Sequence, residues 1–60
     1  AIDFTVSGAD AHQLLRAAMR HGYFTGIGVN QKGPHEKRFL HFDDLPNADG
    51  QPRPTIWSYP

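Results

Sequence analysis

Two residues with metal-binding side chains interrupt apolar stretches of this 60-residue chain. His41 lies within FLHFDDLP, and Asp3 lies within AIDFTV at the start of the sequence. Asp43 follows His41 two positions later. Histidine and carboxylate groups are the ligands that zinc takes in catalytic sites, which combine three protein ligands with one open position. Asp3 and His41 would supply two ligands, so a zinc site of this kind requires a third.

Each of these residues also has an ordinary structural interpretation. A lone histidine in a strand can be a packed or surface side chain, and Asp3 can be an aspartate at a strand edge. A charge placed in an apolar strand nevertheless needs a partner or a metal. His35 could serve as the third ligand only if its turn folds over the site. Asp43 and Asp44 could act as an acid–base pair or belong to a solvated turn, and Asp43 is also a candidate third ligand.

The segments around these side chains predict an α+β fold, a small β-α-β-β unit. Residues 2–6 alternate apolar and polar side chains, which is typical of a half-buried strand. Residues 11–19 carry apolar side chains at helical spacing. Ser7 begins a sequence with capping-box spacing, and Gly22 is the expected residue just after the helix.

Two further strands are predicted to pair as an antiparallel hairpin, over residues 23–29 and 37–43. In the second of these strands, His41 and Asp43 share one face, because side chains alternate along a strand. Leu40 and Phe42 then fill the opposite face. Gly26 and Gly28 weaken the first strand of the hairpin, which indicates that another group approaches its backbone closely.

The C-terminal residues predict an irregular, proline-rich tail. Pro46, Pro52 and Pro54 disfavour both a helix and a strand ladder. Trp57 and Tyr59 are expected to fold this tail back onto the body of the domain.

Composition limits the possible functions. Sixty residues without cysteine form at most one small domain, residues 1–60, with neither disulfides nor thiolate metal sites. The formal charge is zero and the basic residues are scattered, so we expect no nucleic-acid partner. No apolar run approaches the roughly 20 residues that span a bilayer, so we expect no membrane span. A chain this small is marginally stable unless a metal, a partner chain or a larger protein supports it.

Four segments, taken in order, resemble the C-terminal part of a known family. The family comprises the zinc D-alanyl-D-alanine carboxypeptidases and L-alanyl-D-glutamate endopeptidases, which cut peptidoglycan cross-links in bacteria and as phage lysins. AID resembles the end of its zinc-binding H-x-x-G-x-A-x-D segment, and HGYFTGIGV resembles the end of its helix together with the strand that follows. FLHFD resembles the strand with the last zinc histidine, and RPTIW the tail.

The resemblance implies a hydrolase that binds Zn2+ through Asp3 and His41 and cleaves peptide stems of peptidoglycan. It places the protein in the periplasm, the cell wall or a phage particle. The first zinc histidine of the family would lie before Ala1, so residues 1–60 correspond to the C-terminal part of a larger zinc peptidase domain. An upstream segment or a partner chain would then supply the third ligand.

Two departures from the family leave the roles of other residues open. Arg38 occupies the position of the catalytic Glu that many members have in E-x-x-H. Asp43 is then the nearest carboxylate, either as the catalytic base or as a group that orients His41. Arg53, or Arg38 if it reaches the groove, could pair with a substrate carboxylate.

An alternative function belongs to a different class of protein. The chain could be a non-catalytic cell-wall-binding or virion structural module that retains the same fold. The missing histidine and Arg38 favour this alternative. The presence of Asp3, His41 and Asp43 argues against it, because without a metal these groups would only cost stability.

Overall fold

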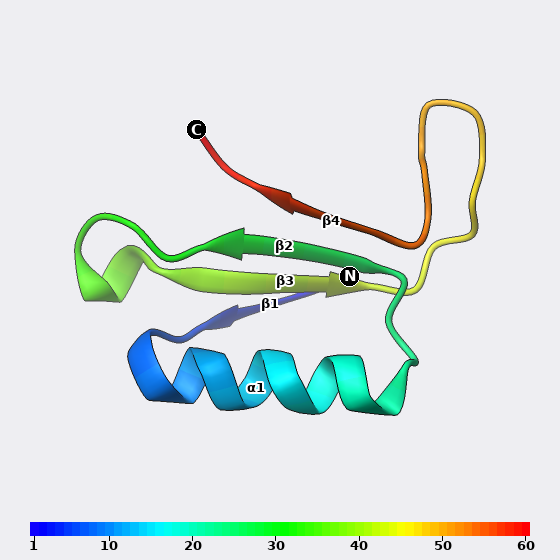
Figure 1. Ribbon diagram of the computed structural model, residues 1–60. Coiled ribbons are helices and arrows are strands. Elements are labelled where there is room, and N and C mark those ends of the chain that lie inside the picture. The colour runs from blue at the N-terminus through cyan, green and yellow to red at the C-terminus, as the bar shows by residue number, and fades with distance from the viewer.

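A single α-helix lies alongside a four-stranded sheet in the computed structural model, which describes residues 1–60 (Figure 1). The elements are β1 (Ile2–Thr5), α1 (Gly8–His21), β2 (Gly26–Asn30), the 3-10 turn η1 (His35–Lys37), β3 (Phe39–Asp43) and β4 (Thr55–Ser58). This arrangement confirms the predicted α+β class. The helix α1 does not have the length and apolar character needed to cross a membrane.

The strand order in the sheet is β1-β3-β2-β4. Strand β3 pairs antiparallel with both β1 and β2, and β4 pairs parallel with β2. The antiparallel hairpin predicted from the sequence is therefore confirmed. Because β1 lies beside β3, the N-terminal strand is brought next to residues almost forty positions later in the chain, and Asp3 is the direct partner of His41.

The hydrophobic core fills the space between α1 and one face of the sheet. Leu40 and Phe42 are each 1% exposed, as the alternation along this strand predicts. The buried apolar residues of the core are Ala11, Ala18, Ile27, Leu40 and Phe42. Because the helix covers this face, the other face of the sheet carries the side chains that alternate with the core residues of β3, among them His41 and Asp43.

The helix ends where the sequence predicts, but its N-terminal cap differs. Gly22 has the left-handed conformation (φ 69°), and its N–H donates to the carbonyl of Ala18. Ser7 is the N-cap residue, yet its side chain makes no capping hydrogen bond. The Ser7 hydroxyl pairs instead with Nδ1 of His35 at 3.2 Å. The predicted capping box therefore does not form, because the Ser7 side chain makes no hydrogen bond to the first turn of the helix.

The tail is more regular than the sequence predicts. Residues Thr55–Ser58 form β4, so the expectation of an irregular tail is wrong for these four residues. Pro52 and Pro54 precede the strand, where proline does not interrupt its ladder. The strand itself combines β-branched and aromatic side chains, which favour extended backbone.

The connection from α1 to β2 is longer than predicted. Strand β2 begins at Gly26 rather than Tyr23. The hydroxyl of Tyr23 donates to Asp44 at 3.1 Å, and the hydroxyl of Thr25 donates to the carbonyl of Leu45 at 2.7 Å. These two side-chain hydrogen bonds join the connection between α1 and β2 to the segment that follows β3. Tyr23 and Thr25 therefore stabilise the contact between these two loops.

Candidate functional site

Three of the predicted site residues come together on the sheet face that α1 leaves open. The imidazole of His41 lies between two carboxylates. Its Nδ1 is 2.7 Å from Oδ1 of Asp3, and its Nε2 is 3.1 Å from Oδ2 of Asp43. The contact with Asp3 joins neighbouring strands, whereas the contact with Asp43 joins two residues on the same face of β3. The cluster therefore follows from strand register and alternation.

The two carboxylates differ strongly in their exposure to solvent. The side chain of Asp3 is 67% exposed, and that of His41 is 19% exposed. Asp43, in contrast, is 3% exposed. The Asp3 side of the imidazole is therefore the side that a ligand from solution can reach, and Asp43 forms the buried wall behind it.

Arg53 neutralises the buried carboxylate with a two-pronged contact. Its Nε donates to Oδ1 of Asp43 at 2.9 Å, and a terminal nitrogen donates to Oδ2 at 2.8 Å. This bidentate geometry is the strongest that an arginine and a carboxylate can form. The guanidinium holds the pKa of Asp43 well below its usual range, although burial of the carboxyl opposes this shift. Asp43 is therefore ionised across the physiological range.

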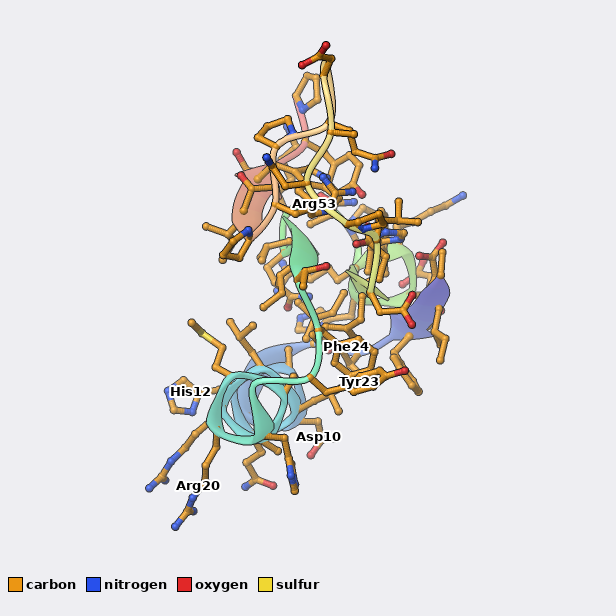
Figure 2. The ribbon with its side chains drawn as sticks, turned by 90° about the vertical axis from the view of Figure 1, so that its right-hand side faces the viewer. Asp10, His12, Arg20, Tyr23, Phe24 and Arg53 are labelled. Carbon is orange, nitrogen blue, oxygen red and sulfur yellow. The ribbon has the colours of Figure 1, made fainter.

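Trp57 completes the cluster from β4. Its ring centroid lies 5.4 Å from that of His41, and the guanidinium carbon of Arg53 lies 5.3 Å from the Trp57 ring. In Figure 2, Arg53 is on the part of the molecule remote from α1, whose His12 and Arg20 point away from the sheet. The indole thus packs beside both the imidazole and the cation that supports it.

The two glycines of β2 make room for this cluster. A Cβ atom on Gly28 would lie 2.6 Å from the Tyr59 hydroxyl oxygen and 2.8 Å from Nε1 of Trp57. A Cβ atom on Gly26 would overlap the carboxylate of Asp43. The prediction that another group approaches the backbone here is confirmed, and so is the return of the aromatic tail to the body of the domain.

His41 is unusual in having a carboxylate oxygen close to each of its two ring nitrogens. A neutral imidazole carries one N–H, so it can donate a hydrogen bond to only one of the two carboxylates. The Asp3 side is the exposed one, so the cluster is suited to bind a cation between Asp3 and His41.

Zinc matches the chemistry of this donor pair but needs more ligands than the pair provides. The ligand atoms of a tetrahedral zinc ion lie about 3.3 Å apart, given bonds of about 2.0 to 2.1 Å. The 2.7 Å between Asp3 and His41 is shorter, and the exposed Asp3 side chain has room to rotate outward. No group of three or more His, Cys, Asp or Glu side chains is gathered so as to hold a metal ion. Asp3 and His41 are the two predicted ligands that the fold brings together on the open face.

Two other candidates from the sequence lie away from this cluster. His35 is part of η1, where its ring pairs with Ser7. Arg38 donates from Nε to the carbonyl of Gly33 at 2.9 Å, and it lines a hollow on the helix side of the sheet together with Leu40. The structure therefore does not bring His35 or Arg38 to the imidazole of His41.

The sequence did not reveal two features of the site. Arg53 was expected to meet a substrate carboxylate, whereas its guanidinium is occupied by Asp43 and is part of a side chain only 12% exposed. Trp57 was expected only to anchor the tail, whereas it also contacts His41 and Arg53. Both residues lie in the segment RPTIW, four positions apart. This proximity was the only feature of the sequence that linked Arg53 to Trp57.

Comparisons of the chain with protein-family models, with curated proteins and with solved structures find no match.

Proposed function

We propose that the chain is the C-terminal part of a zinc-dependent peptidase that cleaves peptide stems of bacterial peptidoglycan. Asp3 and His41 are two of its zinc ligands. The observation that carries this proposal is the approach of Asp3 Oδ1 to His41 Nδ1, at 2.7 Å on the open face of the sheet. A carboxylate behind the other ring nitrogen, as Asp43 is here, is the usual support of a zinc-binding histidine.

The residues of the chain divide the work at this site. Asp3 and His41 hold the metal, and Asp43 fixes the orientation of the imidazole. When bound, zinc supplies a Lewis acid that polarises the scissile carbonyl of the substrate. A third ligand comes from an upstream segment or a partner chain, which agrees with the position of the first zinc histidine in the family that the sequence resembles.

The substrate class is supported by the resemblance of four ordered segments to enzymes that cut peptidoglycan. The competing function is a non-catalytic cell-wall-binding or virion module, and it is favoured by the lack of a gathered set of three metal-binding side chains. The two functions differ in one observable, because only the peptidase breaks a peptide bond in the presence of zinc.

Hydrolysis of a synthetic peptidoglycan stem peptide tests the proposal, with a protein that contains these residues together with its upstream segment. We expect cleavage after loading with zinc, loss of cleavage after chelation, and recovery when zinc is restored. The His41→Ala variant should lose more than about a hundredfold in rate, since even the residues behind metal ligands contribute about 10- to 100-fold.

The matched control is His12→Ala, which removes a histidine from the exposed face of α1 and should leave the rate unchanged. A zinc-loaded wild-type protein that binds the stem peptide without cutting it would support the non-catalytic module instead. The 60-residue chain alone should show little or no turnover, because it lacks the third ligand.

A further inference from the structure

We infer that the free edge of β1 is an interaction surface, and that its partner is the β1 strand of a second copy of this chain. The sheet ends at β1 on one side and at β4 on the other. All four residues of β1 are exposed, Ile2 by 49% and Phe4 by 39%. In Figure 2 the blue ribbon of β1 lies at the outer margin of the sheet. This inference goes beyond the proposed function, because it concerns the edge of the sheet and not the side chains around His41.

The apolar side chains of β1 lie on the helix side of the sheet, where α1 covers them only in part. Ile2 is the direct partner of Phe42, and Phe4 is the direct partner of Leu40. A helix is about 10 Å wide and strands are about 4.8 Å apart, so one helix covers about two strands. The buried residues of the sheet all belong to β2 and β3. The apolar face of β1 therefore lies at the flank of the helix, open to a further element.

The backbone of β1 has unpaired groups at the same edge. The N–H of Val6 donates to the carbonyl of Arg38 at 3.1 Å. Residues that bond to the neighbouring strand alternate with residues that face away from it, so every second residue before Val6 pairs with β3. Asp3 and Thr5 lie between them and direct their N–H and C=O groups to the free edge. These are the groups with which an edge strand binds another strand.

One antiparallel register makes two copies of β1 complementary. When the partner's Thr5 lies opposite Asp3, the two residues exchange both backbone hydrogen bonds, and the two-fold axis repeats the exchange. Phe4 then lies opposite the partner's Phe4, and Ile2 opposite the partner's Val6, so apolar side chains meet on the helix side. Asp3, the only charged residue of β1, faces a threonine and not another charge. The sheet then continues from one copy into the other.

The other edge of the sheet is less suited to pairing. Strand β4 has Pro54 directly before it and Pro60 shortly after it. Proline has no N–H to donate, and proline and lysine are residues that protect edge strands from pairing. β1 contains neither of them. It is therefore the unprotected edge of this sheet.

The total surface of the chain agrees with a small interface. Its accessible surface is 4342 Å², whereas a folded monomer of 6.7 kDa exposes about 3,900 Å². The surplus of roughly 400 Å² is about half of what each partner contributes to an interface of standard size. We therefore expect a weak dimer, which forms between micromolar and millimolar concentrations of the chain.

Sedimentation equilibrium of the chain over this concentration range tests the inference, with a chelator present so that no metal joins two copies. We expect the wild type to change from monomer to dimer as its concentration rises. Thr5→Pro removes an outward N–H without removing a bond to β3, so the dissociation constant should rise at least about tenfold, since each dimer loses two hydrogen bonds. Thr5→Val is the matched control: it keeps the N–H and should dimerise like the wild type.

A second variant keeps the backbone of β1 unchanged. Ile2→Lys places an ammonium group opposite the partner's Val6 and should leave the chain monomeric at concentrations where the wild type is a dimer. Ile2 is an exposed residue, so the amide spectrum of this variant should remain that of a folded chain. The result of Ile2→Lys decides the question if proline at position 5 unfolds the protein.

The register can be tested with single cysteines, because the chain contains none of its own. In the proposed register the Cα atoms of the two Phe4 residues lie about 4.5 Å apart, within the range of a disulfide. The Cα atoms of the two Ile2 residues lie more than about 13 Å apart, which no disulfide spans. Under mild oxidation we expect Phe4→Cys to form a linked dimer and Ile2→Cys to stay largely unlinked.

The outcomes decide between this dimer and other occupants of the edge. A concentration-dependent dimer that is lost in Ile2→Lys, and kept in Thr5→Val, supports the inference. A wild type that stays monomeric at millimolar concentration would leave the edge to another segment or protein, and it overturns the inference. A dimer that forms equally well in Ile2→Lys, or cysteines that link as readily at position 2 as at position 4, overturns it as well.

Discussion

Arg53→Ala is expected to destabilise the chain more than any other substitution at the site. It removes both side-chain hydrogen bonds of Arg53 to Asp43 and leaves a buried carboxylate without its cation. Removing one partner of such a pair is strongly destabilising, because the remaining charge is left without its counterion. A 60-residue domain has a total free energy of unfolding of roughly 3 to 9 kcal/mol. We therefore expect a large unfolded fraction without denaturant, measured by far-ultraviolet circular dichroism in a urea titration.

The control for this prediction is Arg38→Ala. This substitution also removes a guanidinium, but the only side-chain hydrogen bond it breaks is that to the carbonyl of Gly33, in an exposed part of the hairpin loop. Its urea midpoint should stay close to that of the wild type. If Arg53→Ala unfolded at the same urea concentration as Arg38→Ala, the pair of Arg53 and Asp43 would not be holding the site together.

Phe42→Ala is expected to have an effect of similar size at the centre of the core. Phe42 is 1% exposed, and its ring centroid lies 5.0 Å from that of Phe24 and 6.0 Å from that of Phe4. Truncation of a buried phenylalanine costs about 3 to 5 kcal/mol, because a cavity replaces these contacts. We expect the cooperative urea transition to be lost or shifted close to zero denaturant.

Phe4→Ala provides the comparison for the core, since Phe4 packs against the same ring but is 39% exposed. Because less of the Phe4 side chain is buried, its truncation exposes less of the core. The urea midpoint of Phe4→Ala should therefore fall by clearly less than that of Phe42→Ala. If the urea midpoint fell equally in Phe4→Ala and Phe42→Ala, the core would be centred nearer to β1 than the burial of these residues indicates.

Local sequence patterns were sufficient to predict the faces of the sheet. The alternation in FLHFD places Leu40 and Phe42 under the helix and His41 with Asp43 on the other face, as the structure shows. The spacing of the two glycines in β2 indicated a close approach, which Trp57 and Tyr59 make. These features depend on neighbours within a strand, and the side-chain period of a strand is fixed by its backbone geometry.

Contacts between distant segments were harder to predict. Nothing local in the sequence specifies that Asp43 pairs with Arg53, because nine residues, Pro46 and Pro52 among them, lie between the two. The same prolines hid β4, whose ladder begins only after the last of them. The register of β1 on β3, which puts Asp3 opposite His41, depends on tertiary pairing. The metal-ligand role for both residues was proposed from their types and the family resemblance, whereas their contact emerges from the fold.

The open face of the sheet combines a rigid support with an accessible donor. Asp43, Arg53 and Trp57 are packed together and fix one side of the imidazole. Asp3 is free to adjust on the other side because it is exposed. A metal site needs both properties, since the supporting groups orient the ligand and the ligands must still reach the distances that the metal requires.

Titration of the chain with zinc, followed through the ring signals of its four histidines, tests most directly whether Asp3 and His41 form a metal site. We predict that the signals of His41 shift on addition of zinc while those of His12 and His21 do not. The shift should be lost in Asp3→Ala. The proposal that these two residues bind the metal would be contradicted if zinc left the ring signals of His41 unchanged in the wild type. It would also be contradicted if zinc shifted those signals equally in Asp3→Ala.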